Sequence, residues 1–298
     1  MPTTRVDAVL ARRAALAALV VVASVIVLVL IPGAGRSHAA DLMAELRGAG
    51  IGSLTVGHRG DRAEAPENTL PAFAAAFAAG VPVVEADVQL SADGVAVLIH
   101  DETVDRTTDG SGTVAMMTVD ALRALDAGSW YGSEFAGTRI PLLAEFLDLL
   151  AGAPSIAILE LKGYWTVDEI GVVLREIDRS GTHGRVVLGG FHLGTIENAL
   201  AADPDTPRVI IRRQPADPVA LAERFDAIAV VTTVRAVQRD PGIVDALNAA
   251  GRGLLLYTLN GESRWRIAFA AGADGIITDR PEALDAWLGR TRAVGRSQ

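Results

Sequence analysis

The sequence predicts an α/β protein with the TIM (β/α)8 barrel fold. From residue 54 onwards, short apolar runs alternate with helical patterns, and eight such units fill roughly the ~250 residues that a barrel of this kind uses. The runs are apolar throughout, which is typical of parallel strands buried on both faces. An open doubly wound sheet is the alternative fold, but no Gly-x-Gly-x-x-Gly turn supports it.

The expected strands are short β-prone runs bounded by glycine, proline or polar residues. They cover residues 54–57, 83–88, 155–161, 185–191, 208–212, 227–231, 253–259 and 275–278. Helical patterns follow most of them, at residues 70–79, 167–178, 194–201, 234–249 and 263–271. "PENT" precedes the first of these helices, with Asn68 or Thr69 as the expected N-cap.

Residues 1–40 are predicted to be an export segment, followed by a linker at 41–53. An apolar run of 18 residues at 14–31 follows Arg12 and Arg13, a pair that also occurs in twin-arginine signals. The run is just long enough to cross a bilayer, whereas a secretory signal core usually has ~7–15 residues. Its length favours an uncleaved single-pass anchor, and the small residues Ser37 and Ala39, around His38, favour a cleaved signal. Because the arginines stay inside, we expect the barrel at the extracytoplasmic face of the cell membrane, or secreted.

The composition limits the partners. The chain has no cysteine, so it forms neither disulfides nor a thiolate metal site. Its net charge is −9, and because residues 1–40 hold four arginines and one acid, the remainder carries −12. This balance argues against nucleic acid as a partner, since binding a phosphate backbone needs clustered positive charge. An acidic body is compatible with a divalent cation.

Three acids are expected at the C-terminal ends of the barrel strands, where TIM-barrel enzymes place their active sites. Glu85 and Asp87 are two apart in "VVEADVQL" and point to the same side of one strand, and Glu160 lies on another apolar strand. Taken singly, each acid is better explained by an ion pair with an arginine. Together they would repel one another, and a hard cation that prefers oxygen ligands, Ca²⁺ or Mg²⁺, would remove that conflict.

Two histidines are expected beside these acids. His58 follows the first strand, between Gly57 and Gly60, which allow either a close approach to the substrate or a plain turn. A hairpin turn at residues 93–94 would pair residues whose numbers sum to about 187, and this sets His100 roughly opposite the second strand's last acid. His58 and His100 would form an acid and base pair suited to near-neutral pH.

Lys162 is the only lysine among 27 basic residues. It lies two residues after Glu160 and therefore on the same side of the strand. A compact ammonium that contacts a phosphate explains why arginine does not stand here; chance survival at a solvated strand end is the alternative. Arg59, after the first strand, and Asn260, after the seventh, complete the polar set at the strand ends.

Five ordered motifs, from Leu54 to the C-terminal helix, resemble those of the glycerophosphodiester phosphodiesterase family, in the phospholipase-C-like barrel superfamily. They read "HRGDRAEAPENT", "EADVQLSADGVAVLIHDETVDRTTDGSG", "ELK", "LYTLN" and "GADGIITDRP". The resemblance implies a barrel at residues 54–290, with an insertion at about 103–141 and a tail at 291–298. It also implies metal-dependent hydrolysis of glycerophosphodiesters, which are small-molecule phosphodiesters, to sn-glycerol 3-phosphate and an alcohol.

The resemblance also assigns roles to residues that the strand-end argument selects. It implies metal ligands at Glu85, Asp87 and Glu160, catalytic histidines at His58 and His100, and phosphate contacts at Arg59 and Lys162. Further substrate contacts are expected from Glu67, Phe191, Tyr257 and Asn260.

The chain departs from the family's usual pattern at two places. Glycines at 189 and 190 stand where serines are common before a phenylalanine, and Tyr257 replaces a tryptophan. Both changes put the substrate preference in doubt, so a lysophospholipase D or sphingomyelinase D-like enzyme, acting on lysolipid at a membrane, stays an alternative. An inactive exported binding module is a second alternative, against which the intact set of acids and histidines argues.

Overall fold

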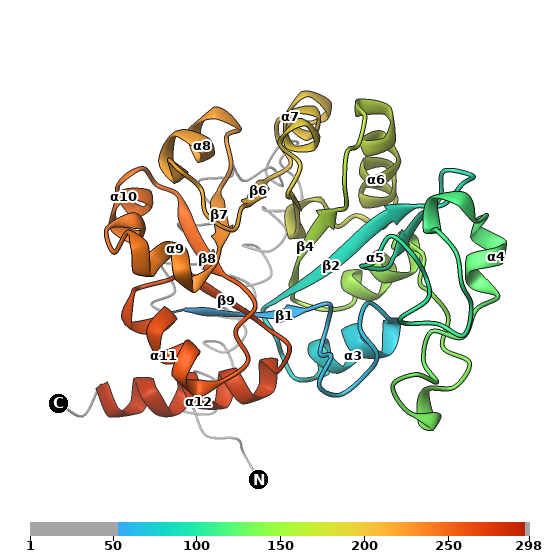
Figure 1. Ribbon diagram of the computed structural model, residues 1–298, viewed down its shortest axis with the longest axis horizontal. Coiled ribbons are helices and arrows are strands. Elements are labelled where there is room, and N and C mark those ends of the chain that lie inside the picture. The colour runs from blue at the N-terminus through green and yellow to red at the C-terminus, as the bar shows by residue number, and fades with distance from the viewer. Residues whose placement is uncertain (1–52, 296–298) are drawn as a thin grey trace, which may run out of the picture. The chain divides into compact units, whose positions relative to one another are not determined.

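The computed structural model of the protein describes residues 53–295, and they form the predicted barrel (Figure 1). Eight parallel strands close into a ring, because β1 pairs with both β2 and β9. The ring consists of β1 (Leu54–His58), β2 (Val83–Leu90), β4 (Ile156–Leu161), β5 (Val186–Gly190), β6 (Arg208–Ile211), β7 (Ala229–Thr232), β8 (Gly253–Leu256) and β9 (Gly275–Thr278). The predicted export segment at 1–40 and the linker up to residue 52 lie outside the described residues.

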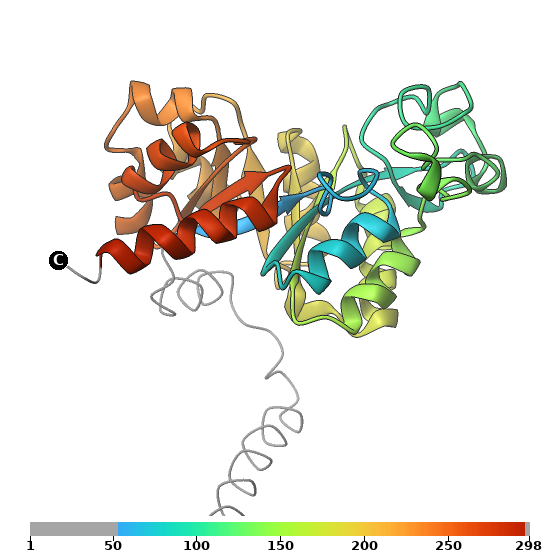
Figure 2. The ribbon, with the colours of Figure 1, turned by 90° about the horizontal axis from the view of Figure 1, so that it is seen from below.

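Helices surround the barrel (Figures 1 and 2). They are α3 (Leu70–Ala78), α5 (Leu143–Ala151), α6 (Val167–Ser180), α7 (Leu193–Ala202), α8 (Pro218–Arg224), α9 (Val234–Arg239), α10 (Ile243–Ala249), α11 (Glu262–Ala270) and α12 (Pro281–Gly295). The single helix predicted at 234–249 is wrong, because the chain divides into α9 and α10 around Pro241, which has no N–H and disfavours a helical residue before it. The helix α8 was not predicted; it is short, and Asp217 caps it by accepting a hydrogen bond from the N–H of Ala220.

The hairpin after β2 is present, but its register differs by one residue from the prediction. β3 (Ala96–Leu98) pairs antiparallel with β2, and Val88 lies opposite Leu98, so the paired numbers sum to 186. The N–H of Ser91 donates to the carbonyl of Val95, which closes a three-residue turn that ends in Gly94 at φ +76°. This turn is one residue longer than the two-residue turn predicted at residues 93–94.

The predicted insertion forms a separate lobe beside this hairpin, drawn in green in Figures 1 and 2. It contains α4 (Val119–Arg123) and the 3-10 turns Val114–Met116 and Ser133–Phe135. A small apolar cluster that includes Val97 of β3 and Leu122 of α4 holds the lobe together. The lobe is thereby fixed to the strand that delivers His100.

The hydrophobic core has two layers, as expected for a barrel. Val56, Ile158, Val209 and Val231 belong to a buried cluster contributed by the barrel strands, and larger clusters fill the space between the strands and the helices. Within residues 53–295, no helix is long and apolar enough to cross a bilayer.

In the loop from β1 to α3, neither Asn68 nor Thr69 caps the helix with its side chain as predicted. Thr69 is the N-cap residue of α3, but its hydroxyl donates to the carbonyl of Pro66 and caps no N–H of the helix. Asn68, at φ +55°, turns its side chain towards β2 instead. Gly60 lies against the backbone of Ala72 in α3, so the glycine serves close packing of the loop on the helix.

Candidate active site

A cavity of about 370 Å³ opens at the C-terminal ends of the strands. This is the end at which a TIM barrel carries its catalytic residues. Eight of the predicted site residues line the cavity: His58, Arg59, Glu85, His100, Glu160, Lys162, Phe191 and Tyr257. Asp87 is buried directly beside it, while Glu67 and Asn260 are not among its lining residues.

The three predicted acids form one cluster. Glu85 and Asp87 project from β2 and Glu160 from β4, and the parallel register pairs Asp87 with Glu160. One carboxylate oxygen from each residue lies within 4.8 Å of the other two, and all three side chains are buried. The fold therefore brings together the three acids that strand geometry predicts at one site.

Burial and neighbouring charges shift the pKa values of all three acids in this cluster. Burial, followed by the charges of Asp87 and Glu160, raises the pKa of Glu85 well above its usual range. Burial also raises the pKa of Glu160. Burial acts on Asp87 in the same direction, but Lys162 and Arg59 outweigh it and lower the pKa of Asp87.

The cluster fits a divalent cation. The Oε1 atom of Glu85 is buried and has no hydrogen-bond partner among the described residues, although buried carboxylate oxygens normally have one. A hard cation would supply the missing positive charge and accept the oxygen ligands of all three acids. The residues that would hold it are Glu85, Asp87 and Glu160.

Two cationic side chains flank the acids. The Nζ atom of Lys162 lies 2.6 Å from Glu160 and 3.3 Å from Asp87, and the Nε atom of Arg59 lies 3.1 Å from Asp87. Arg59 has a left-handed backbone, at φ +58°, and its N–H donates to Glu85 at 3.0 Å. Such a conformation is uncommon for a residue other than glycine, and here it belongs to a residue that lines the cavity.

Each predicted histidine is held by a carboxylate. His58 Nδ1 lies 2.6 Å from Asp279, and His100 Nδ1 lies 2.6 Å from Asp101. Since an ionised carboxylate only accepts hydrogen bonds, Nδ1 donates in both pairs, which leaves Nε2 to exchange protons. Burial outweighs the bond to Asp279 and lowers the pKa of His58, so this imidazole is neutral near pH 7.

Glu67, which was expected to contact the substrate, is the centre of an arginine network. Its carboxylate accepts hydrogen bonds from Arg59 at 2.5 Å and Arg106 at 2.7 Å, and it forms an ion pair with Arg62 at 2.8 Å. Burial opposes its charge, but the arginines outweigh burial and lower the pKa of Glu67 to about 2. Arg106 also binds Asp101, so the network links Arg59 to the partner of His100.

Sequence reasoning missed three residues that support the site. Asn68 holds Asp87 twice, since its Nδ2 donates to the carboxylate at 2.8 Å and its Oδ1 accepts the N–H of Asp87. Asp279 orients His58, and its position directly after the last strand, in "GIITDRP", was the available signal. Arg106 comes from the insertion, for which the strand-end argument gives no signal.

Of the other residues predicted to contact the substrate, two line the cavity and one does not. Phe191 and Tyr257 line the cavity, with their ring centroids 6.1 Å apart. Asn260 instead holds Asp279, to which its Nδ2 donates at 2.6 Å. A Cβ atom at Gly189 would lie 2.9 Å from the Cγ2 atom of Val209, so a serine there would require the side chain of Val209 to shift.

These features suit an anionic ester. Arg59 and Lys162 can bind the oxygens of a phosphate, and two oriented histidines can move the protons that cleavage of a P–O bond requires. The fold and the site thus define the class of TIM-barrel phosphodiesterases.

Comparison with known proteins narrows this class. The sequence model of the glycerophosphoryl diester phosphodiesterase family matches residues 58–283, so the chain belongs to that family and is an enzyme of the phosphoric diester hydrolase type. A glycerophosphodiester phosphodiesterase of Caldanaerobacter subterraneus is 33% identical over 237 residues, which cover 78% of this chain and 96% of the relative.

Solved structures agree with this assignment. The crystal structure of glycerophosphodiester phosphodiesterase from Agrobacterium tumefaciens is 31% identical, with a TM-score of 0.70 over 78% of this chain and 99% of that one. An Oleispira antarctica phosphodiesterase, solved in complex with the product sn-glycerol-3-phosphate, is 28% identical, with a TM-score of 0.73 over 80% of this chain and 97% of that one.

Proposed function

We propose that the protein hydrolyses glycerophosphodiesters to sn-glycerol 3-phosphate and an alcohol, with one divalent cation, Ca²⁺ or Mg²⁺, as its cofactor. The observation that carries this proposal is the meeting of two carboxylate-held histidines, three buried acids and two cations in one cavity. The Oleispira relative, which was solved with sn-glycerol-3-phosphate, supports the proposed product.

In this proposal, Glu85, Asp87 and Glu160 hold the cation, which when bound neutralises negative charge on the phosphate oxygens. Arg59 and Lys162 bind the remaining phosphate oxygens and stabilise the charge that develops on them during cleavage. Glu67 and Asn68 are positioning residues, because they act through Arg59 and Asp87 respectively.

The two histidines move the protons. One of His58 and His100 takes a proton from the nucleophile at Nε2, and the other gives a proton to the leaving oxygen. Asp279 and Asp101 keep each ring in the tautomer that this requires. The nucleophile is either water or the substrate's own neighbouring hydroxyl through a cyclic phosphate, and both routes use the same two histidines.

Metal removal tests the proposal. The full chain is purified in detergent and assayed with glycerophosphocholine and glycerophosphoinositol, and released sn-glycerol 3-phosphate is measured. EDTA should abolish turnover, and Ca²⁺ or Mg²⁺ should restore it. Turnover that is indifferent to chelation would show that the acids are structural only.

The same assay separates the two alternatives. Micelles of lysophosphatidylcholine replace the water-soluble substrates in a parallel reaction. Turnover of lysolipid alone would identify a lipid-directed phosphodiesterase, and tight binding without turnover of any substrate would identify a binding module.

We also propose that the barrel acts outside the cytoplasm, either anchored to the membrane or secreted. The support for this proposal is the apolar run at residues 14–31, preceded by Arg12 and Arg13.

A further inference from the structure

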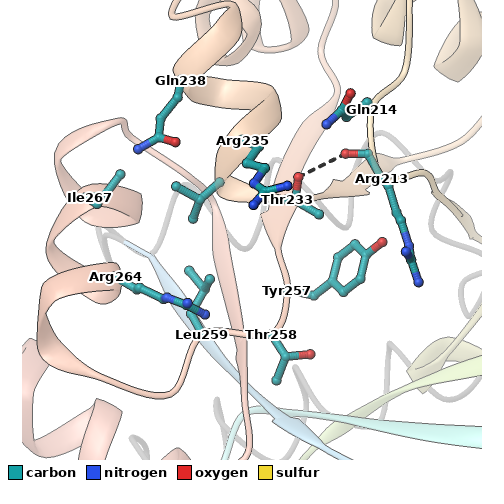
Figure 3. A pocket seen from close by; sticks show the side chains of 11 residues that line it. Arg213, Gln214, Thr233, Arg235, Gln238, Tyr257, Thr258, Leu259, Arg264 and Ile267 are labelled. Atoms are coloured by element: carbon teal, nitrogen blue, oxygen red, sulfur yellow. Dashed lines mark hydrogen bonds between the residues drawn. The ribbon is translucent and has the colours of Figure 1, made fainter.

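A second cavity of about 550 Å³ adjoins the active site. Arg213, Tyr257 and Thr258 line both cavities, so the two form neighbouring compartments on the same end of the barrel. The second cavity lies among the segments that follow β6, β7 and β8, together with α9 and α11 (Figure 3). Its size is within the ~300–1,000 Å³ typical of small-molecule sites.

The second cavity is cationic. Three arginines line it, Arg213 after β6, Arg235 in α9 and Arg264 in α11, and none of its eleven lining residues is an acid. Figure 3 shows Arg235 and Arg264 reaching from two helices towards the same space, while Arg213 passes beside the hydroxyl of Tyr257. Within residues 53–295, none of the three arginines forms an ion pair with an acid.

This concentration of positive charge is unusual for the chain. The protein as a whole carries a net charge of −9, and its other arginines include many that pair with acids, such as Arg59 and Arg123. Arginines that are left without acids around one cavity create a local positive field that attracts an anion. Gln214 adds to this preference, because its carbonyl oxygen accepts a hydrogen bond from Arg239 and its amide group remains as a donor.

We propose that the second cavity binds a negatively charged group on the alcohol half of the substrate, and that it binds a phosphate group most tightly. This inference rests on the proposed hydrolysis of glycerophosphodiesters. With the scissile phosphate between Arg59 and Lys162, the second cavity begins at Tyr257 and Thr258, which line both cavities, and we assign this side to the alcohol half. The preferred substrates are therefore glycerophosphodiesters whose alcohol is itself phosphorylated.

A cationic or uncharged alcohol gains nothing from this cavity. The ammonium group of choline would face three arginines, and the lining lacks a carboxylate that would bind it. One guanidinium group can bind two phosphate oxygens at once. The arginines therefore distinguish a phosphorylated alcohol from its unphosphorylated counterpart.

Two substrates that differ by one phosphate test the proposal. The full chain is assayed with glycerophosphoinositol and with glycerophosphoinositol 4-phosphate, and the ratio of their kcat/KM values is measured. We expect the ratio to favour the phosphorylated substrate by about tenfold or more. Arg235→Gln and Arg264→Gln should each lower this ratio about tenfold, and Arg235→Lys should keep part of it.

Arg266→Gln is the matched control. Arg266 lies in the same helix as Arg264 and is exposed, but it does not line the cavity, so its replacement should leave the ratio unchanged. A wild-type ratio near one, or a ratio that Arg235→Gln and Arg264→Gln leave intact, would overturn the proposal.

Two further outcomes are separable. If the wild type hydrolyses neither substrate, the proposed function fails, whereas hydrolysis of both at equal rates overturns only the headgroup inference. Inorganic phosphate is tested as an inhibitor of glycerophosphoinositol hydrolysis. If the arginine variants change this inhibition but not the substrate ratio, the cavity is a site for free phosphate, and the substrate assignment is wrong.

Discussion

Glu67 shows how a single residue can organise a site without lining it. Its carboxylate forms ion pairs with Arg59, Arg62 and Arg106, and it is almost fully buried. A buried charge is tolerated only where it is paired and hydrogen-bonded, and Glu67 meets this requirement on both oxygens. Arg59 is therefore held at the cavity by a partner that does not line it.

Replacing Glu67 by Gln should remove this restraint. We expect kcat/KM to fall by about 10- to 100-fold, because the guanidinium of Arg59 loses the carboxylate that binds its terminal nitrogen and keeps only the contact of its Nε atom with Asp87. Glu64→Gln is the control, since Glu64 is exposed in the same loop. Circular dichroism checks that the variant is folded, and unchanged kinetics in folded Glu67→Gln protein would refute the positioning role.

The buried carboxyl group of Asp61 should make the folding stability depend on pH. Its Oδ2 atom is buried without a hydrogen-bond partner among the described residues, and burial raises its pKa from 3.8 to about 6. The folded state therefore binds this proton more tightly than the unfolded chain, so stability falls as the pH rises from about 4 to about 6. Asp61→Asn should raise the free energy of unfolding by about 1–3 kcal/mol at pH 7.5, and the gain should shrink towards pH 4. Urea denaturation at both pH values measures this, and a gain that is equal at both would contradict it.

The sequence was informative for residues on strands and silent for residues whose loops it could not place. Glu85, Asp87 and Glu160 were found because strand geometry fixes which side they face and parallel strands end together. Asn68 and Arg106 were not found, because their positions depend on the path of a loop and of an insertion. Glu67 was expected to contact the substrate, and its pairing with arginines was not foreseen for the same reason.

At the scale of elements, regular strands and helices followed from apolar patterning, and the misses concern turns and breaks. The hairpin register was wrong by one because the identity of Asp93 and Gly94 does not distinguish a two-residue from a three-residue turn. Pro241 indicates the break between α9 and α10. The break was not predicted because the apolar periodicity continues across it.

The loop from β1 to α3 also gives a prediction about packing. Gly60 has φ +86°, and a Cβ atom there would lie 2.7 Å from the backbone of Ala72. Gly80, at the other end of α3, has φ +73° but nothing within 4 Å of a Cβ atom. Both alanine variants should lose ~1 kcal/mol to the left-handed backbone, and Gly60→Ala should lose a further ~1–3 kcal/mol to the clash. Equal urea midpoints for the two variants would contradict this packing.

At the scale of the whole molecule, the chain combines an acidic barrel with an apolar N-terminal segment. We expect export to depend on residues 14–31. A β-lactamase fused after residue 295 should protect bacterial cells from ampicillin, and deletion of residues 14–31 should abolish this protection. Ampicillin resistance that survives the deletion would overturn the export proposal.

The most direct test of the central claim is the release of sn-glycerol 3-phosphate from glycerophosphoinositol by two histidine variants. His58→Ala and His100→Ala should each lose about 100- to 10,000-fold in kcat, with unchanged circular dichroism, because proton transfer at the scissile bond depends on both rings. His183→Ala serves as the control, since His183 is exposed and pairs with Asp178 away from the cavity. Near-normal turnover by either His58→Ala or His100→Ala would contradict the account.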